Sequence, residues 1–274
     1  MIEPDARGLP RRRWLAGALG LGAAVGSLAG LGGCASAPLA DGEAAADDGT
    51  HPPSPEVVPF SSAAPGLPPE GWRPYVLRRD LTRTRYAVVR EGQQRVLHAQ
   101  AASSATGLRC AVHIDPAERS QLRFSWKVRD VHPKADISEA VLDDAPARLI
   151  VAFDGDHTRL PLRERLLFDQ VELFTGQRLP FATLMYVWDG GRHAVDTVHR
   201  NHRSSRIQYL TVQSGTEGTG RWLHYQRDVA ADYRRVYGEA PGTIIGVGVL
   251  TDADAMKLQF EAWYGDISLR PARA

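Results

Sequence analysis

Residues Gln121–Arg129 read QLRFSWKVR, and apolar and polar side chains alternate along the whole stretch. Every second residue from Leu122 to Val128 is apolar, and the residues between them are polar or charged. A period of two is typical of a β-strand with one face in a core and one face in water. The stretch therefore predicts a half-buried strand, and the same pattern can be sought in the rest of the chain.

Further segments repeat this short alternating pattern between Gly-, Pro- and Asp-containing turns. They are Trp72–Arg78, Arg85–Arg90, Arg95–Ala101, Leu108–Ile114, Ala147–Phe153, Ala182–Trp188, Arg206–Gln213, Trp222–Asp228, Thr243–Leu250 and Leu258–Leu269. Ala147–Phe153 and Thr243–Leu250 are apolar on both sides, which predicts central strands. In Leu108–Ile114 the same alternation turns Cys110 towards the core, so we expect a buried, inert thiol.

Two segments depart from the β rhythm. Apolar residues keep roughly helical spacing between Pro161 and Gly176, which predicts an amphipathic helix packed on the sheets. A shorter helix is predicted over Ala230–Tyr237, with Gly238 as its left-handed C-cap. Many strands, few helices and no βαβ alternation predict an all-β fold, an antiparallel two-sheet β-sandwich of the jelly-roll type with one or two short helices.

The N-terminal residues have the features of an export signal. Arg11 and Arg12 lead into a Gly/Ala/Leu run that ends at Cys34, and small residues precede that cysteine. The arginine pair resembles a twin-arginine signal, with the general secretory route and an uncleaved anchor as alternatives. The Leu-Gly-Gly-Cys ending resembles the lipobox of bacterial lipoproteins, so residues 1–33 are the expected signal peptide. Lipidation of Cys34 implies a periplasm-facing protein anchored in the cell envelope, with the outer membrane as its expected location.

Composition bounds the remainder of the chain. Residues 34–66 are rich in Pro and Ala and predict a disordered tether, followed by the folded domain at residues 67–270. The chain has 33 basic and 32 acidic side chains, and four of the basic and two of the acidic ones lie in residues 1–33. The remainder of the chain therefore has 29 basic and 30 acidic side chains. A net charge near −1 offers no footprint for nucleic acid. Once Cys34 is acylated, Cys110 has no partner for an intramolecular disulfide.

Two groups of acids are candidates for chemistry. General acid/base hydrolysis needs two carboxylates at a defined separation, and the candidates flank one central strand: Asp143 and Asp144 before it, Asp154 and Asp156 after it. Solvated turns are the alternative reading of the same acids. The Asp252-Ala-Asp254 loop offers oxygen ligands to a structural Ca²⁺, with a plain turn as the alternative. No other cofactor is expected.

Aromatic and polar residues on the late strands suggest a surface for a flat ligand. Rings stack on sugars while charged groups fix their orientation. The candidates are Trp188, Trp222, His224, Arg227, Glu261 and Tyr264. Packing in the core is the alternative reading for the tryptophans.

Several motifs follow one another along the folded domain. They are Leu67–Trp72, Phe124–Val128, Asp143–Arg148, Leu184–Trp188, Arg227–Asp228 with Asp232–Tyr233, and Thr251–Asp254 leading to Tyr264–Ile267. Their order resembles a known bacterial family, domain of unknown function 3047, over about residues 67–270. The resemblance implies an exported protein without an assigned activity. The final Tyr-Gly-Asp-Ile also looks like the closing strand of galactose-binding-like jelly rolls, which concerns the fold and not the function.

Several motifs of this family contain charged residues, and we expect these side chains to form a network of ion pairs at one end of the sandwich. The network is either a ligand site or a set of buried ion pairs that holds loops in place. Its members are Lys127, Asp144, Arg148, Arg227, Asp228 and Asp232. The expected function is non-catalytic binding of a carbohydrate or an envelope component. The alternatives are a hydrolase of glycans or other envelope polymers that uses the loop acids, and a structural or assembly factor whose apolar surface contacts an envelope protein.

Overall fold

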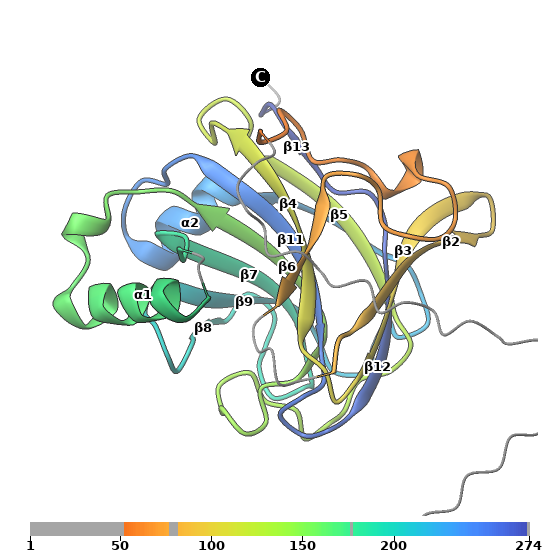
Figure 1. Ribbon diagram of the computed structural model, residues 1–274. Helices are drawn as coiled ribbons and strands as arrows, with labels where there is room; N and C mark the ends of the chain where they lie inside the picture. The colour runs from red at the N-terminus through yellow and green to blue at the C-terminus, as the bar shows by residue number, and fades with distance from the viewer. Residues whose placement is uncertain (1–51, 77–81, 176–177, 273–274) are drawn as a thin grey trace, which may run out of the picture. The chain divides into compact units, whose positions relative to one another are not determined.

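The structure is a computed structural model that describes residues 52–76, 82–175 and 178–272. Two β-sheets face each other across a shared core, as Figure 1 shows. The expected signal residues Arg11 and Arg12 and the expected lipidation site Cys34 lie outside the described residues. Among the described residues, no helix combines the length and the apolar composition that crossing a membrane requires.

The first sheet has seven strands in the order β1-β4-β11-β6-β7-β9-β8. Their bounds are Trp72–Val76, Thr106–Ile114, Ile244–Asp252, Ala145–Phe153, Ala182–Asp189, Ile207–Ser214 and Val198–Arg200. All pairs in this sheet are antiparallel except β7 with β9. The strands β6 and β11, apolar on both sides, are central as predicted.

The second sheet has six strands in the order β10-β5-β12-β3-β2, with β13 paired to β5 beside this path. Their bounds are Leu223–Asp228, Gln121–Val128, Gln259–Tyr264, Gln94–Ala102, Arg85–Glu91 and Ser268–Arg270. The run predicted as one strand, Leu258–Leu269, divides into β12 and β13 around Gly265. A Cβ at Gly265 would collide with the Ser125 hydroxyl, so the chain passes β5 there with no side chain.

The alternation along Gln121–Val128 has the expected consequence. Leu122, Phe124, Trp126 and Val128 are buried between the sheets, and the residues between them face outward. The all-β sandwich predicted from the sequence is confirmed, and the buried, free Cys110 lies in its core.

Residues 52–66 correct the prediction of a tether that reaches residue 66. Ser54 bridges to Val112 of β4, Gly66 bridges to Val88 of β2, and Phe60 opens a 3-10 helix, η1 (Phe60–Ser62). Phe60 is fully buried, with its ring centroid 4.6 Å from that of Trp72. The apolar residues set among the prolines therefore bind this segment to the sandwich, and residues 34–51 lie outside the described residues.

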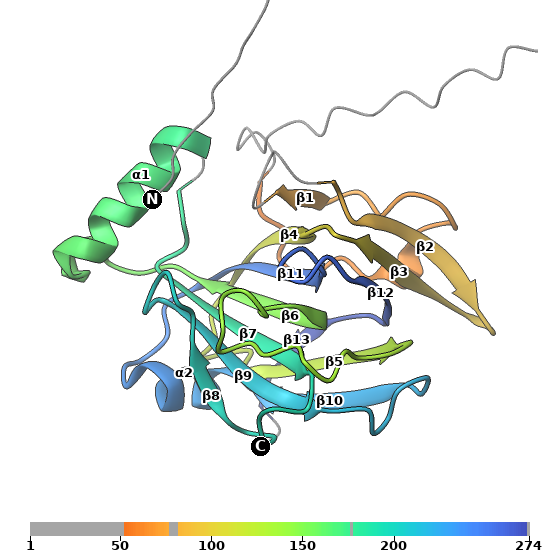
Figure 2. The same cartoon turned by 90° about the horizontal axis from the view of Figure 1, so that it is seen from below.

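Helix α1 (Leu162–Thr175) forms where predicted, after the 3-10 helix η2 (His157–Arg159). The helix packs on the sandwich, but through other residues than expected. Leu162 and Leu166, which share the predicted apolar spacing, are 63% and 59% exposed, and Leu173 on the same side is 80% exposed. Phe168 lies in the core, and Leu167 packs against it. Figure 2 shows α1 standing to one side of the strands.

Helix α2 (Val229–Tyr237) confirms the second predicted helix. Gly238 closes it at φ +70°, in the left-handed conformation expected of a glycine C-cap. At the other end, the Asp228 carboxylate accepts hydrogen bonds from the backbone N–H groups of Ala230 and Ala231 at 3.1 and 3.0 Å. Asp228 is therefore an N-cap.

Candidate functional site

The outer face of the six-stranded sheet carries a row of side chains from adjacent strands. The strand register places His98 of β3 opposite Trp263 of β12, and Trp263 opposite Lys127 of β5. Trp222 directly precedes β10 and continues the row, because its neighbour Leu223 pairs with Trp126. Since side chains alternate along each strand, all four project away from the core.

Rings and charges interleave along this row. The Lys127 ammonium lies 4.2 Å from the ring centroid of Trp263 and 5.8 Å from that of Trp222. These distances are in the range of cation–π attraction. The His98 ring stacks on Trp263, with centroids 4.7 Å apart and planes 8° apart. Lys127 also forms an ion pair with Glu91 of β2.

Glu261 connects this row to the end of β5. Its carboxylate accepts from Arg129 Nη1 at 2.6 Å and lies 3.2 Å from His98 Nε2. Both contacts reach outward side chains of neighbouring strands. The half-buried charges on this face are thus held in fixed positions before any ligand arrives.

An open depression lies on the same face, over β5 and β10. Its volume is about 420 Å³, and its outward lining includes Arg123, Ser125, His224 and Gln226, with Asp266 at its margin. The register pairs His224 with Ser125 and Gln226 with Arg123. We call the six outward residues Arg123, Ser125, Lys127, Trp222, His224 and Gln226 the β5–β10 face.

A second group of charges lies where β6 begins and β11 ends. Arg148 Nη2 donates to the Asp143 backbone carbonyl at 2.8 Å and to Asp143 Oδ1 at 2.9 Å, and it lies 3.3 Å from Asp252 Oδ2. Tyr209 donates to Asp143 Oδ2 at 3.0 Å. Burial opposes the charge of Arg148, but Asp143 and Asp252 outweigh it and raise the pKa of the guanidinium. This is a buried network that fixes the Asp143 loop.

Three carboxylates, from Asp144, Asp252 and Asp254, lie close together at the same end of the sheet. Asp144 is fully buried and accepts from the backbone N–H groups of Ala255 and Met256, each at 2.9 Å. One oxygen from each of Asp144, Asp252 and Asp254 lies within 4.8 Å of the others. Burial raises the pKa of Asp252 well above its usual range, and Asp254 and Asp143 raise it further against the effect of Arg148. These three residues have the spacing to hold a metal ion.

The single charged network expected from the sequence is instead three separate sets of contacts. Lys127 lies on the outer face, Arg148 at the start of β6, and Arg227 near α2. Arg227 forms a bidentate pair with Asp232, from Nε at 2.9 Å and from Nη2 at 2.7 Å, and Tyr186 donates to the same carboxylate at 2.9 Å. The last set pins helix α2 to the strands.

Two aromatic candidates are core residues and present no ring to a ligand. Trp188 is fully buried and its indole N–H donates to the Gly215 carbonyl at 2.9 Å. Tyr264 is buried, and its hydroxyl lies 2.8 Å from the Thr251 hydroxyl. Trp263, which the sequence reasoning missed, is the ring of β12 that faces outward. Alternation from Glu261 places Trp263 on the same face and Tyr264 on the opposite one.

The four candidate catalytic acids are divided between the two ends of β6. Asp143 and Asp144 precede it, while Asp154 and Asp156 follow it, so the strand of about 30 Å separates the two pairs. Asp156 caps η2 through the Thr158 N–H at 2.9 Å, and Asp154 accepts from the Gly155 N–H at 2.8 Å. The two pairs do not face each other across the cleft that a hydrolytic pair requires.

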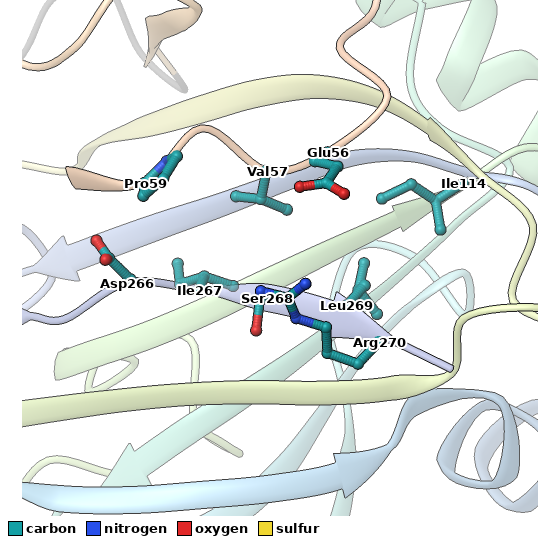
Figure 3. A pocket seen from close by; sticks show the side chains of 9 residues that line it. All are labelled: Glu56, Val57, Pro59, Ile114, Asp266, Ile267, Ser268, Leu269 and Arg270. Carbon is teal, nitrogen blue, oxygen red and sulfur yellow. The ribbon is translucent and has the colours of Figure 1, made fainter. Parts of the chain in front are cut away.

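A smaller pocket of about 170 Å³ marks the seam between the N-terminal segment and β13 (Figure 3). Glu56, Val57 and Pro59 form one side, and Asp266–Arg270 form the other. The Asp266 carboxylate accepts from the Ser61 N–H at 2.9 Å, which fastens the seam. The candidate site residues predicted from the sequence do not line this pocket.

A family model described as "Protein of unknown function (DUF3047)" matches residues 70–268 of the chain. The resemblance seen in the sequence motifs is thereby confirmed. No curated protein matches the chain.

Several solved structures are similar in part. An exo-β-agarase is 10% identical, with 81% of this chain and 25% of that chain covered and a TM-score of 0.41. A β-1,2-glucanase from Parabacteroides distasonis is also 10% identical, with 81% and 26% covered and a TM-score of 0.37. The family 30 carbohydrate-binding module of the cellulosomal cellulase Cel9D-Cel44B of Clostridium thermocellum is 13% identical, with 81% and 96% covered and a TM-score of 0.36. The chain spans about a quarter of the length of the two enzymes.

Proposed function

The chain belongs to the DUF3047 family, and we propose that it binds a carbohydrate on the β5–β10 face without chemically altering it. One observation carries the proposal: Trp222 lies beside Lys127 on the outer face, next to the open depression of about 420 Å³. The sandwich buries Trp126 and Trp188 in its core, whereas Trp222 and Trp263 lie on the outer face.

The chemistry of the face suits a sugar. An indole ring offers an apolar platform for a pyranose ring, and neighbouring polar side chains supply hydrogen bonds to its hydroxyls. From Trp222 to Gln226 the face extends about 13 Å along β10, enough for an oligosaccharide of a few units. Arg123 supplies an exposed cation in this row, so sugars that carry carboxylates suit the face as well as neutral ones.

The test is titration of the full-length protein with soluble neutral and uronic-acid-containing oligosaccharides, followed by calorimetry and tryptophan fluorescence. We expect Trp222→Ala to weaken binding about tenfold or more, because the ligand would cover this ring in the complex as at an aromatic hot spot. We expect Arg123→Ala to lower the affinity for acidic sugars and not for neutral ones. Arg163→Ala, an exposed arginine of α1, is the matched control and leaves binding unchanged. Absence of binding across the panel, or equal binding by Trp222→Ala, would overturn the proposal.

The location proposed for this activity is the periplasmic side of the bacterial envelope, with Cys34 as the lipid anchor. Its support is the sequence Arg11-Arg12 and the Leu-Gly-Gly-Cys ending at Cys34. Wild-type protein and the control Cys110→Ser are expected in the membrane fraction, and Cys34→Ser in the soluble fraction. Membrane association of Cys34→Ser without acyl label would contradict the anchor.

One observation favours a second candidate function, contact with another envelope protein. Leu162, Leu166 and Leu173 share one side of α1 and are exposed. A row of exposed leucines is a feature of contact surfaces. Cross-linking in intact cells through cysteines placed at Leu166 and Leu173 tests this candidate, with a cysteine at the exposed Val141 as the control.

A further inference from the structure

We propose that Asp144, Asp252 and Asp254 form a binding site for a divalent cation of the calcium type. The pairing of β6 with β11 sets Asp252 opposite Ala145, the residue after Asp144. Asp254 follows in the connection from β11 to β12. Residues more than 100 positions apart thus place three carboxylate oxygens within 4.8 Å of one another.

A buried oxygen without a partner gives the second, independent indication of a ligand. Asp252 is 6% exposed, and within the described part of the chain its Oδ1 has no hydrogen-bond donor. Arg148 contacts the other oxygen, Oδ2, at 3.3 Å. A carboxylate oxygen that has lost water and gained no partner costs free energy, and a cation beside it removes that cost.

The balance of charge points the same way. Asp143, Asp144, Asp252 and Asp254 bring four carboxylates to this end of the sheet, and Arg148 is the guanidinium that ion pairs place against them. Like charges at such separations favour binding of a proton or a cation. The two backbone N–H groups that hold Asp144 occupy one lone pair on each of its oxygens, and a carboxylate has further lone pairs for a cation.

The spacing and the donor type favour calcium over smaller or softer metals. Carboxylate oxygens suit hard cations, and Ca–O distances of about 2.3–2.6 Å let one ion bridge oxygens up to about 5 Å apart. Mg²⁺, with bonds of about 2.0–2.1 Å, bridges a shorter span. The described residues supply neither sulfur nor imidazole to this group, which argues against a site of the zinc type.

The expected role of the cation is to fasten the start of β6 to the loop between β11 and β12. Asp144 already holds this loop through the Ala255 and Met256 N–H groups. A ligand that binds the folded chain and not the unfolded chain raises the melting temperature by mass action. This inference does not depend on carbohydrate binding.

The experiment uses the full-length protein, treated with a chelator and then titrated with CaCl₂ and, separately, MgCl₂. Calorimetry gives the Kd and thermal unfolding gives the shift in Tm. We expect Ca²⁺ to raise the Tm more than Mg²⁺ does, and Asp254→Asn to weaken the Kd for Ca²⁺ at least tenfold. Asp154→Asn, an exposed acid after the far end of β6, is the matched control and behaves as wild type.

Two results would overturn the site. One is a wild-type protein with neither binding heat nor a change in Tm at millimolar Ca²⁺. The other is an Asp254→Asn protein, folded by circular dichroism, that binds Ca²⁺ as wild type does. Should the carboxylates share a proton instead, the Tm would respond to acidification and not to Ca²⁺, which also rejects the cation.

Discussion

Arg148 and Asp143 are joined by two hydrogen bonds from one guanidinium nitrogen, at 2.8 Å to the backbone carbonyl and at 2.9 Å to the carboxylate. Arg148 is buried in a central strand, and Asp252 contacts the same nitrogen. The guanidinium therefore links the loop before β6 to the end of β11. Its removal would leave the Asp143 and Asp252 carboxylates together, with little exposure to water, and without a positive charge between them.

The first prediction concerns this ion pair. Arg148→Ala is expected to lower the free energy of unfolding by about 3–5 kcal/mol, because the buried Asp252 and the partly buried Asp143 would lose the guanidinium that pairs with them. Urea unfolding followed by tryptophan fluorescence measures the change. Arg163→Ala, on the exposed side of α1, is the control and should stay within about 0.5 kcal/mol of wild type. A loss below about 1 kcal/mol for Arg148→Ala would show that the pair contributes little.

The second prediction concerns stability in acid. Partial burial of the Asp136 carboxylate raises its pKa, but hydrogen bonds from Ser138 and His193 outweigh this and lower the pKa to about 2 from an ordinary 3.8. The stability it contributes is complete above pH 3.8 and is lost as the pH falls through about 2. Asp136→Asn should therefore flatten the dependence of unfolding free energy on pH between 4 and 2. Asp154→Asn is the control, and identical slopes for Asp136→Asn and wild type would refute the assignment.

The third prediction concerns the nearby histidines. Burial, and to a smaller extent His193, lowers the pKa of His199 below its ordinary 6.5. The neutral ring is the form that the folded protein prefers, so its contribution is complete above pH 6.5 and declines as the pH falls below that value. His199→Phe should reduce the loss of stability between pH 7 and 5 in urea unfolding. His113→Phe, on the exposed side of β4, is the comparison and should keep the wild-type slope.

The fourth prediction separates the two sides of α1. Phe168→Ala removes a core ring and should cost about 3–5 kcal/mol. Leu166→Ala alters a side chain that is largely in water and should change stability by no more than about 0.5 kcal/mol. Thermal unfolding of both proteins under the same conditions measures the contrast. Equal losses would mean that the leucine side of the helix is covered.

The fifth prediction concerns a close approach of backbone. A Cβ at Gly242 would meet the carbonyl oxygen of Asp154, whereas the nearest atom to a Cβ at Gly246 is 3.6 Å away. Gly242→Ala should cost about 1–3 kcal/mol through overpacking. Gly246→Ala has room, and it should be neutral or stabilise the strand by a fraction of a kcal/mol. Chemical denaturation of both variants decides, and a neutral Gly242→Ala would contradict the close approach.

The sequence predicted the sandwich well because alternation is a direct record of burial. Gln121–Val128 shows this, since each apolar residue is buried between the sheets. It predicted α1 but not its surroundings, because helical spacing says which leucines share a side and not what covers them. The prediction of a tether over residues 52–66 is wrong because it depends on average composition, which does not show that a single residue such as Phe60 is buried in the core.

The candidate site was predicted only in part, because it depends on which strands become neighbours. Asp252 and Asp254 were recognised from their spacing, but Asp144 joins them only through the pairing of β6 with β11. Lys127 and Trp222 were noted separately, and the register of β5 with β10 brings them together. Strand alternation applied to Glu261 predicts that Trp263, two residues later on the same strand, also faces outward.

The burial of Phe60 against Trp72 bears on how the domain is best cut for expression. The region that the family shares begins at residue 70, yet the core takes in Val57 and Phe60 ahead of it. A chain shortened to residue 70 would open a hole where the Phe60 ring had been and would free the edges of β4 and β2 that Ser54 and Gly66 contact. A fragment that keeps all of these contacts therefore starts upstream of the shared family region, at or before Ser54.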